Sequence, residues 1–124
     1  MSLLSQLSSF QPLQFAGGNV TLTPIIDPIT LDSYKKGKPA KLTVQSGYLL
    51  KSPRNNRFTD ELKSLVPWYA MRWDGNRLVW WIDTPYITAV VLDVIADFFD
   101  PALAGELDSL RKSSKAIELV AVIE

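Results

Sequence analysis

Seven basic side chains lie between positions 33 and 58, where the sequence has no acidic residue. Lysine and arginine neutralise phosphate groups and aromatic rings stack on bases, so the two together are typical of proteins that bind single-stranded nucleic acid. The basic residues are Lys35, Lys36, Lys38, Lys41, Lys51, Arg54 and Arg57. The aromatic residues among them are Tyr34, Tyr48 and Phe58. A solvated, lysine-rich loop over packed aromatic rings explains the segment as well, and both interpretations stay open.

Four tryptophans between positions 68 and 81 form a second candidate, namely Trp68, Trp73, Trp80 and Trp81. Indole rings can form a platform for bases or another ligand, and they can also fill a core or anchor a subunit interface. Because both faces of the hairpin predicted here are largely apolar, we favour a role in the core and in an oligomer interface.

Six acidic residues and no basic residue lie between positions 82 and 110. Asp93, Asp97 and Asp100 share one face of a predicted helix, where carboxylates suit a hard cation such as Mg²⁺. A solvated outer face is the simpler interpretation, and we predict no metal site. The separation of basic from acidic residues predicts two functional faces, or contact between opposite faces of two copies.

The sequence contains neither cysteine nor histidine. It therefore lacks thiol chemistry, disulfides, the usual zinc ligands and the commonest general base at neutral pH. Ser33 and Lys36 have S-x-x-K spacing, but the other parts of that catalytic constellation are missing. We expect no enzyme activity, no catalytic residue and no cofactor.

The 124 residues suffice for one domain with a buried core, so we predict a single domain, 1–124. Hydrophobic residues make up 47% and charged residues 21%, as is typical of globular proteins. The longest apolar run, 86–99, is interrupted by polar residues, which argues against a membrane span. The N-terminus lacks the basic flank of a signal peptide, so we expect a cytoplasmic protein.

A hairpin predicted over residues 40–52 would position the basic residues. It turns at Ser46–Gly47, which places Lys41 nearly opposite Lys51 and gathers the seven basic residues at one sheet edge. One face of this hairpin is predicted to be core, and it carries Leu42, Val44 and Leu49. The other is a mixed polar face that carries Tyr48.

The remaining pattern predicts the surrounding elements. They are a helix around 3–10, a strand over 19–26, a helical turn over 59–65 capped by Thr59, a central hairpin over 68–82 turning at 74–76, a helix from Thr84–Pro85 to Phe98, a helix around 103–110 and a strand over 116–123. The β-branched residues of 87–95 leave a strand there as an alternative. We predict an α+β fold, with a twisted antiparallel β-sheet of about five or six strands and one or two C-terminal helices packed on one face.

Two short pieces resemble the Whirly family of single-stranded-DNA-binding proteins. Residues 36–40, Lys-Gly-Lys-Pro-Ala, resemble the family's KGKAA-type motif. Residues 98–101, Phe-Phe-Asp-Pro, with the basic pair 111–112 and residues 115–117, resemble its FFHDP helix end and the trailing basic stretch and strand. The pieces keep the family's order but stand closer together. The resemblance implies a sheet with a helical bundle, a tetramer and binding of unpaired DNA across strand edges, and it carries over to Lys36, Gly37 and Lys38.

Two functions follow as expectations. The leading one is a small protein that binds single-stranded DNA or RNA through the basic loop and sheet edge, needs no cofactor and forms a homo-oligomer. The alternative is a protein-interaction or assembly module that forms a homo-oligomer through its apolar Trp-rich hairpin without nucleic acid.

Overall fold

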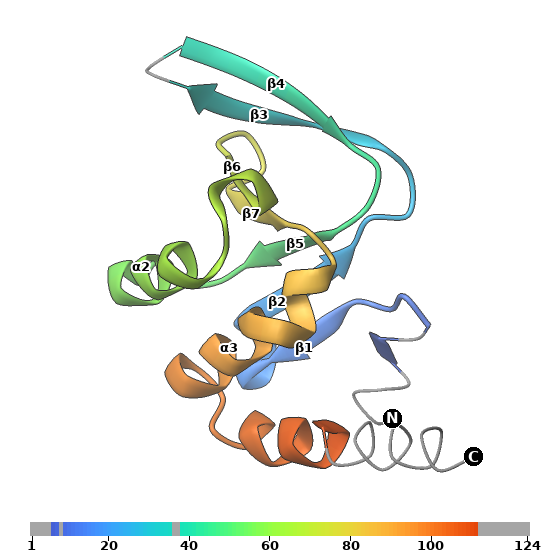
Figure 1. Cartoon of the computed structure of the whole chain (residues 1–124), viewed down its shortest axis with the longest axis vertical. Coiled ribbons are helices and arrows are strands. Elements are labelled where there is room, and N and C mark those ends of the chain that lie inside the picture. The colour runs from blue at the N-terminus through green and yellow to red at the C-terminus, as the bar shows by residue number, and fades with distance from the viewer. Residues whose placement is uncertain (1–5, 8, 36–37, 112–124) are drawn as a thin grey trace, which may run out of the picture.

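The structure, a computed structural model, describes residues 6–7, 9–35 and 38–111, with the backbone alone for 33–35 and 38–40. Its strands form two sheets, and helices from the C-terminal half cover one side of the larger sheet (Figure 1). The fold is α+β, as predicted. Within the described ranges, no helix combines the length and apolar composition needed to cross a membrane.

Five short antiparallel strands form the larger sheet, in the spatial order β1-β2-β5-β7-β6. The strands are β1 (Leu13–Phe15), β2 (Val20–Pro24), β5 (Tyr48–Lys51), β6 (Met71–Asp74) and β7 (Val79–Ile82). Because β6 is the last strand, the prediction that the hairpin over 68–82 is central is wrong. Its residues are apolar on both faces because β7 is covered on both sides.

The β6–β7 hairpin divides its side chains between two faces as predicted, but its turn is longer. Asp74 is the register partner of Val79, so four residues, 75–78, connect the strands. The carboxylate of Asp74 accepts hydrogen bonds from the N–H groups of Asn76 and Arg77, both at 2.9 Å. Leu78, the residue before β7 begins, adopts a positive φ of 58°. These side chain–backbone bonds favour the longer turn over the tight one.

A two-stranded ribbon, β3 (Ile29–Lys35) and β4 (Lys38–Val44), packs on the other face of the sheet. Leu31, Val44 and Trp81 form a small second core between ribbon and sheet. The predicted hairpin over 40–52 is therefore wrong, because β4 pairs with β3, whereas β5 pairs with β2 and β7.

The predicted faces of that hairpin are wrong for the same reason. Tyr48 and Leu50 belong to the main core, whereas Leu42 is exposed. Gly47, with φ of +120°, lies in the bend that carries the chain from the ribbon into the sheet. The local turn signal at residues 46–47 is real, but it marks a change of sheet and not a hairpin.

Helices form the layer beneath the larger sheet. They are α2 (Asn56–Leu65), the π-helical segment η3 (Ile87–Val91) that continues into α3 (Leu92–Phe98), and residues 103–111. Short 3₁₀ turns lie at η1 (Ala16–Gly18) and η2 (Trp68–Ala70). Asn55, and not Thr59, caps α2, since its Oδ1 accepts the N–H of Phe58 at 3.1 Å. The predicted helices over 84–98 and 103–110 are confirmed, with their apolar stripes in the core.

The predicted strand over 116–123 lies outside the described residues, as do Lys36 and Gly37. Of the predicted N-terminal helix, the structure describes Gln6 and Leu7 as helical.

Candidate functional site

The basic residues of the ribbon lie along its two strands. Lys35 and Lys38 are register partners at its closed end, and Lys41 is the partner of Asp32. Lys41 is exposed. The ribbon therefore brings lysines from both strands toward one end, as the backbone register alone requires.

The other predicted basic residues lie elsewhere. Lys51 ends β5 as the register partner of Thr21, Arg54 follows in the loop, and Arg57 lies in the first turn of α2. All three are exposed. The β6–β7 hairpin stands between α2 and the closed end of the ribbon (Figure 1). The predicted convergence of seven basic residues is wrong, because it required β4 to pair with β5.

Two of the aromatic residues predicted to stack on bases are enclosed in the core. Tyr48 is 3% exposed and Phe58 1% exposed. Burial also raises the pKa of the Tyr48 hydroxyl. Neither ring presents a face to a base, which removes Tyr48 from the candidate nucleic-acid surface. Tyr34 remains, in β3 as the register partner of Pro39.

Trp81 is also a core residue. It packs with Leu31 and Val44, and its indole Nε1 donates a hydrogen bond to the carbonyl oxygen of Ser46 at 2.9 Å. A ring that is satisfied and buried in this way has no surface for a subunit contact. The prediction that Trp81 is an interface residue is wrong, because β7 turns this side chain toward the ribbon.

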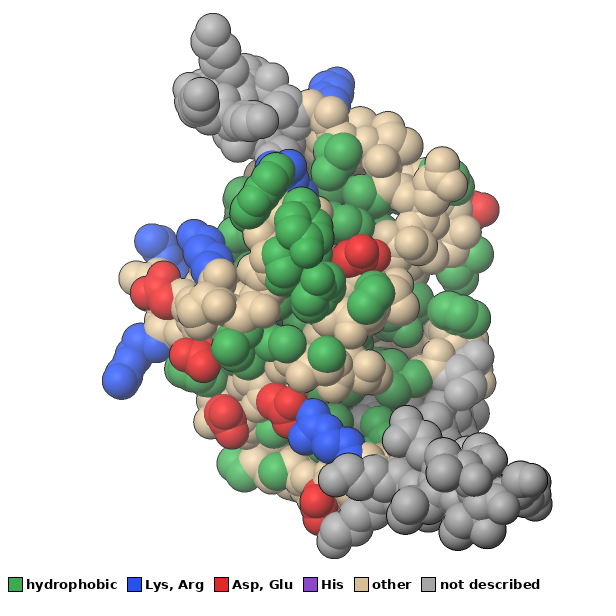
Figure 2. Space-filling model, in the orientation of Figure 1, with side chains coloured by type: hydrophobic (Ala, Val, Ile, Leu, Met, Phe, Trp, Pro, Cys, Tyr) green, Lys and Arg blue, Asp and Glu red, His purple; other side chains and the backbone are tan. Residues whose placement is uncertain are grey.

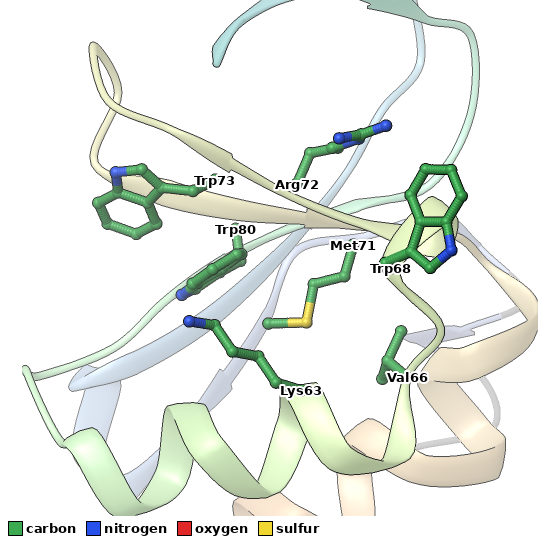
Figure 3. Close-up of a pocket in the computed structure, with 7 residues that line it drawn as sticks. All are labelled: Lys63, Val66, Trp68, Met71, Arg72, Trp73 and Trp80. Atoms are coloured by element: carbon green, nitrogen blue, oxygen red, sulfur yellow. The ribbon is translucent and has the colours of Figure 1, made fainter. Parts of the chain in front are cut away.

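The other three tryptophans line an open groove of about 440 Å³ between α2 and the edge strand β6 (Figure 3). Trp68 is 72% exposed, Trp73 is 39% exposed and Trp80 is half-buried. The Trp73 and Trp80 rings meet edge to face, with their centroids 5.2 Å apart. This aromatic groove is lined by Lys63, Val66, Trp68, Met71, Arg72, Trp73 and Trp80.

Two cations and no carboxylate stand among the lining residues of the aromatic groove. The Lys63 Nζ atom lies 5.5 Å from the centroid of Trp80, and the guanidinium carbon of Arg72 lies 5.4 Å from that of Trp68. Figure 3 shows Arg72 on the opposite side of β6 from Met71 and Lys63. The Nε of Arg72 is buried and has no hydrogen-bond partner among the described residues. The groove therefore combines apolar rings with positive charge on both sides of one strand.

Apolar surface continues beyond the aromatic groove. Leu65, Tyr69 and Leu78 are exposed. The hydroxyls of Tyr69 and Tyr86 lie 3.4 Å apart. In the view of Figure 2, hydrophobic side chains gather near the centre of the visible surface, with Lys and Arg side chains beside them. Clustered exposed aromatic residues of this kind mark interaction sites more often than ordinary surface does.

Lys63, Val66, Met71 and Arg72 were not predicted as site residues. Arg72 alternates with the tryptophans in the hairpin, and Lys63 follows the buried Leu62 in α2. No local pattern indicates that the end of α2 lies beside β6. Only the shared core of helix and sheet brings these residues together.

Two of the three aspartates on the predicted acidic helix face make structural contacts. Asp93 accepts a hydrogen bond from Arg111 Nη2 at 2.5 Å, and Asp100 accepts one from the N–H of Ala16 at 3.1 Å. Asp97 is exposed. Across the part of the chain that the structure describes, no group of three or more acidic side chains is arranged to hold a metal ion.

Comparisons with known proteins give no match. No family model matches the chain, and neither a curated protein nor a solved structure is significantly similar to it. The resemblance to the Whirly family rests on its short motifs alone.

Proposed function

We propose that this protein is an interaction module that binds another polypeptide chain through the aromatic groove. The observation that carries the proposal is the exposure of Trp68 and Trp73 around a groove whose floor, Val66 and Met71, is apolar. Tryptophan and arginine are the side chains most enriched in the energetic centres of protein interfaces, where an indole in a pocket contributes most of the affinity.

Selection from a displayed random peptide library tests this function. Peptides selected on the wild-type protein are expected to bind the Trp68→Ala/Trp73→Ala variant at least about tenfold more weakly, because each such indole typically contributes about 2 kcal/mol. Phe10→Ala is the matched control, since Phe10 is 59% exposed but does not line the groove. Failure to select any peptide, or equal binding to the double variant, would overturn the proposal.

The ribbon favours a second candidate function, the binding of single-stranded nucleic acid. Lys35 and Lys38 are register partners at the end of the ribbon and Lys41 is exposed further along β4. Lys36 and Gly37, which carry the Whirly resemblance, stand between the two strands in the sequence. Lysines spaced along a ribbon suit the phosphates of an extended strand.

Fluorescence anisotropy of a labelled single-stranded oligonucleotide at two salt concentrations tests this second function. Binding should weaken steeply with salt, because each phosphate contact releases counterions. Lys36→Ala/Lys38→Ala should abolish it, whereas Lys51→Ala/Arg54→Ala should change it little. Absence of binding at low salt would eliminate this candidate.

A further inference from the structure

We infer that two copies of this chain associate through the outer edge of β4, which joins their two-stranded ribbons into one antiparallel sheet. The inference goes beyond the proposed function, because it uses the ribbon and leaves the aromatic groove free. It follows from the direction of the backbone groups of β4, from the exposed side chains of that strand, and from the one register that suits both.

The outer edge of β4 is the side of the ribbon that faces away from the rest of the molecule. β3 lies between β4 and the β6–β7 hairpin (Figure 1), and the N–H of Gly75 donates to the carbonyl of Asp32 at 2.9 Å. Within the described residues, β3 is the only strand that pairs with β4. The outer side of β4 is therefore an unpaired sheet edge, whereas β6 has β3 beside it.

The backbone bonds of β3 show which groups of β4 are available. The carbonyls of Thr30 and Asp32 accept bonds from the β6–β7 turn at 3.0 and 2.9 Å, so these residues direct their backbone groups away from β4. In an antiparallel pair, two opposite residues either exchange both bonds or direct both away. Thr43 and Lys41, the register partners of Thr30 and Asp32, therefore direct N–H and C=O outward. Outside the ribbon, neither has a backbone bond within the described chain.

One two-fold register uses all of these groups. When Leu42 is opposite Leu42 of the second copy, Lys41 of each copy exchanges both backbone bonds with Thr43 of the other. Leu42 is 37% exposed, and the two leucines meet at the two-fold axis as a pair without mutual backbone bonds, in which side chains approach most closely. Main-chain bonds and apolar burial therefore coincide at one place.

The neighbouring registers are less favourable. A shift that sets Lys41 opposite its own copy brings like charges together and pairs Thr43 with Pro39, which has no N–H to donate. A shift the other way sets Thr43 opposite its own copy and pairs Lys41 with Gln45, which lies beyond the end of β4. Lysine and proline on an edge strand limit its pairing, and here they leave one register.

Charge agrees with a second copy as the occupant. In this register each Lys41 lies between Asp32 of its own ribbon and Thr43 of the other copy, on one face of the joined sheet. A carboxylate is therefore already opposite each lysine, and no like charges stand directly opposite each other. Because the contact is short, we expect a weak dimer that forms as the concentration rises.

Sedimentation equilibrium of the full chain from about 10 μM to about 1 mM tests the inference. The wild type should convert from monomer to dimer in this range. Thr43→Glu sets a carboxylate opposite Lys41 of the other copy and should tighten the dimer at least about threefold, whereas Thr43→Lys should weaken it by at least as much. Thr30→Val is the matched control, because it also removes the hydrogen bond between the Thr30 and Thr43 hydroxyls but lies away from the contact.

Backbone hydrogen exchange identifies the edge that is used. Raising the protein concentration should slow exchange of the Lys41 and Thr43 amides. The Leu42 amide alternates with them and points toward β3, so its exchange should change little. Slowed exchange that appears only when an oligonucleotide or a library peptide is added would assign the edge to that partner and overturn the inference.

The remaining outcomes separate this inference from the proposed function. A chain that stays monomeric at about 1 mM, or a dimer that responds to neither Thr43 variant, would overturn the inference alone. A dimer that is lost in Trp68→Ala/Trp73→Ala would also overturn it, because the contact would then lie at the aromatic groove. An intact dimer whose aromatic groove selects no peptide would overturn the proposed function and leave this inference standing.

Discussion

Arg77 uses one side-chain nitrogen to connect Asp74 to the ribbon. Its Nη1 lies 2.6 Å from Oδ2 of Asp74 and 3.0 Å from the carbonyl oxygen of Thr30. The N–H of Gly75 also donates to the carbonyl of Asp32 at 2.9 Å. The β6–β7 turn therefore fastens the hairpin that carries the aromatic groove to β3. Asp74 is the only buried charged residue of the described chain, and all of its side-chain bonds serve this turn.

Asp74→Asn should destabilise the protein. The variant loses a charged hydrogen bond to Arg77, and such a bond typically contributes about 1.5–3 kcal/mol to the free energy of unfolding. Urea denaturation at neutral pH measures the difference, with Asp60→Asn on the exposed side of α2 as the control. An unfolding free energy equal to that of the wild type would mean that the turn does not depend on this carboxylate.

The same variant should reveal a pH dependence. Burial would raise the pKa of Asp74, but hydrogen bonds from the backbone and side chain of Arg77 and from the backbone of Asn76, with the charge of Arg77, outweigh it and hold the pKa below its ordinary 3.8. Because the folded pKa is the lower one, the stabilisation is complete above pH values near 3.8 and is lost as the pH falls through the folded pKa.

Denaturation at a series of pH values measures this effect. The difference in unfolding free energy between wild type and Asp74→Asn should stay constant near neutrality and shrink in acid. A difference that grows in acid would contradict the direction assigned to the pKa of Asp74.

Gly47→Ala should be strongly destabilising. A Cβ at this position would lie 2.5 Å from Nε1 of Trp81 and 2.7 Å from the carbonyl oxygen of Ile82, and φ is +120°. Backbone strain and overpacking together should cost at least about 2 kcal/mol. In contrast, Gly105→Ala meets no atom within 4 Å and should raise stability by about 0.4–1 kcal/mol. Thermal unfolding of the two variants in parallel checks both signs.

Replacing Trp81 should destabilise the protein far more than replacing Trp68. Trp81→Ala removes a ring that is 7% exposed and should cost about 3–5 kcal/mol of unfolding free energy. Trp68→Ala should cost less than about 1 kcal/mol, since that ring is 72% exposed. Comparable losses in the two variants would show that Trp68 is not a surface residue in solution.

Local pattern predicts much of this fold. The helix over 84–98 follows from Pro85 at its start and the 3.6-residue spacing of its apolar residues, and β2 follows from the alternation at Val20 and Leu22. The division of faces in the β6–β7 hairpin follows from alternation too, even though its turn is longer than predicted. These features depend on neighbours within one turn or one hairpin.

Local sequence pattern does not show which strands pair with each other. Ile29–Lys35 has strand-forming residues, but Asp27–Pro28 indicates a loop, and no local signal shows that β4 pairs backward with β3. The predicted pairing of β4 with β5 therefore placed Tyr48 on a polar face instead of in the core, because the side of a strand that faces the core depends on its partner strands. The aromatic groove was missed for a related reason. It forms only where Phe58 and Leu62 fix α2 against the sheet, a contact between distant parts of the chain.

The most direct test of the aromatic groove as a polypeptide-binding site is a two-dimensional ¹H–¹⁵N spectrum of the four indole N–H groups, recorded while the tightest library peptide is added. The account predicts that the signals of Trp68, Trp73 and Trp80 shift, while that of Trp81, bonded to Ser46 in the core, stays in place. Three unmoved groove signals at saturating peptide would contradict it.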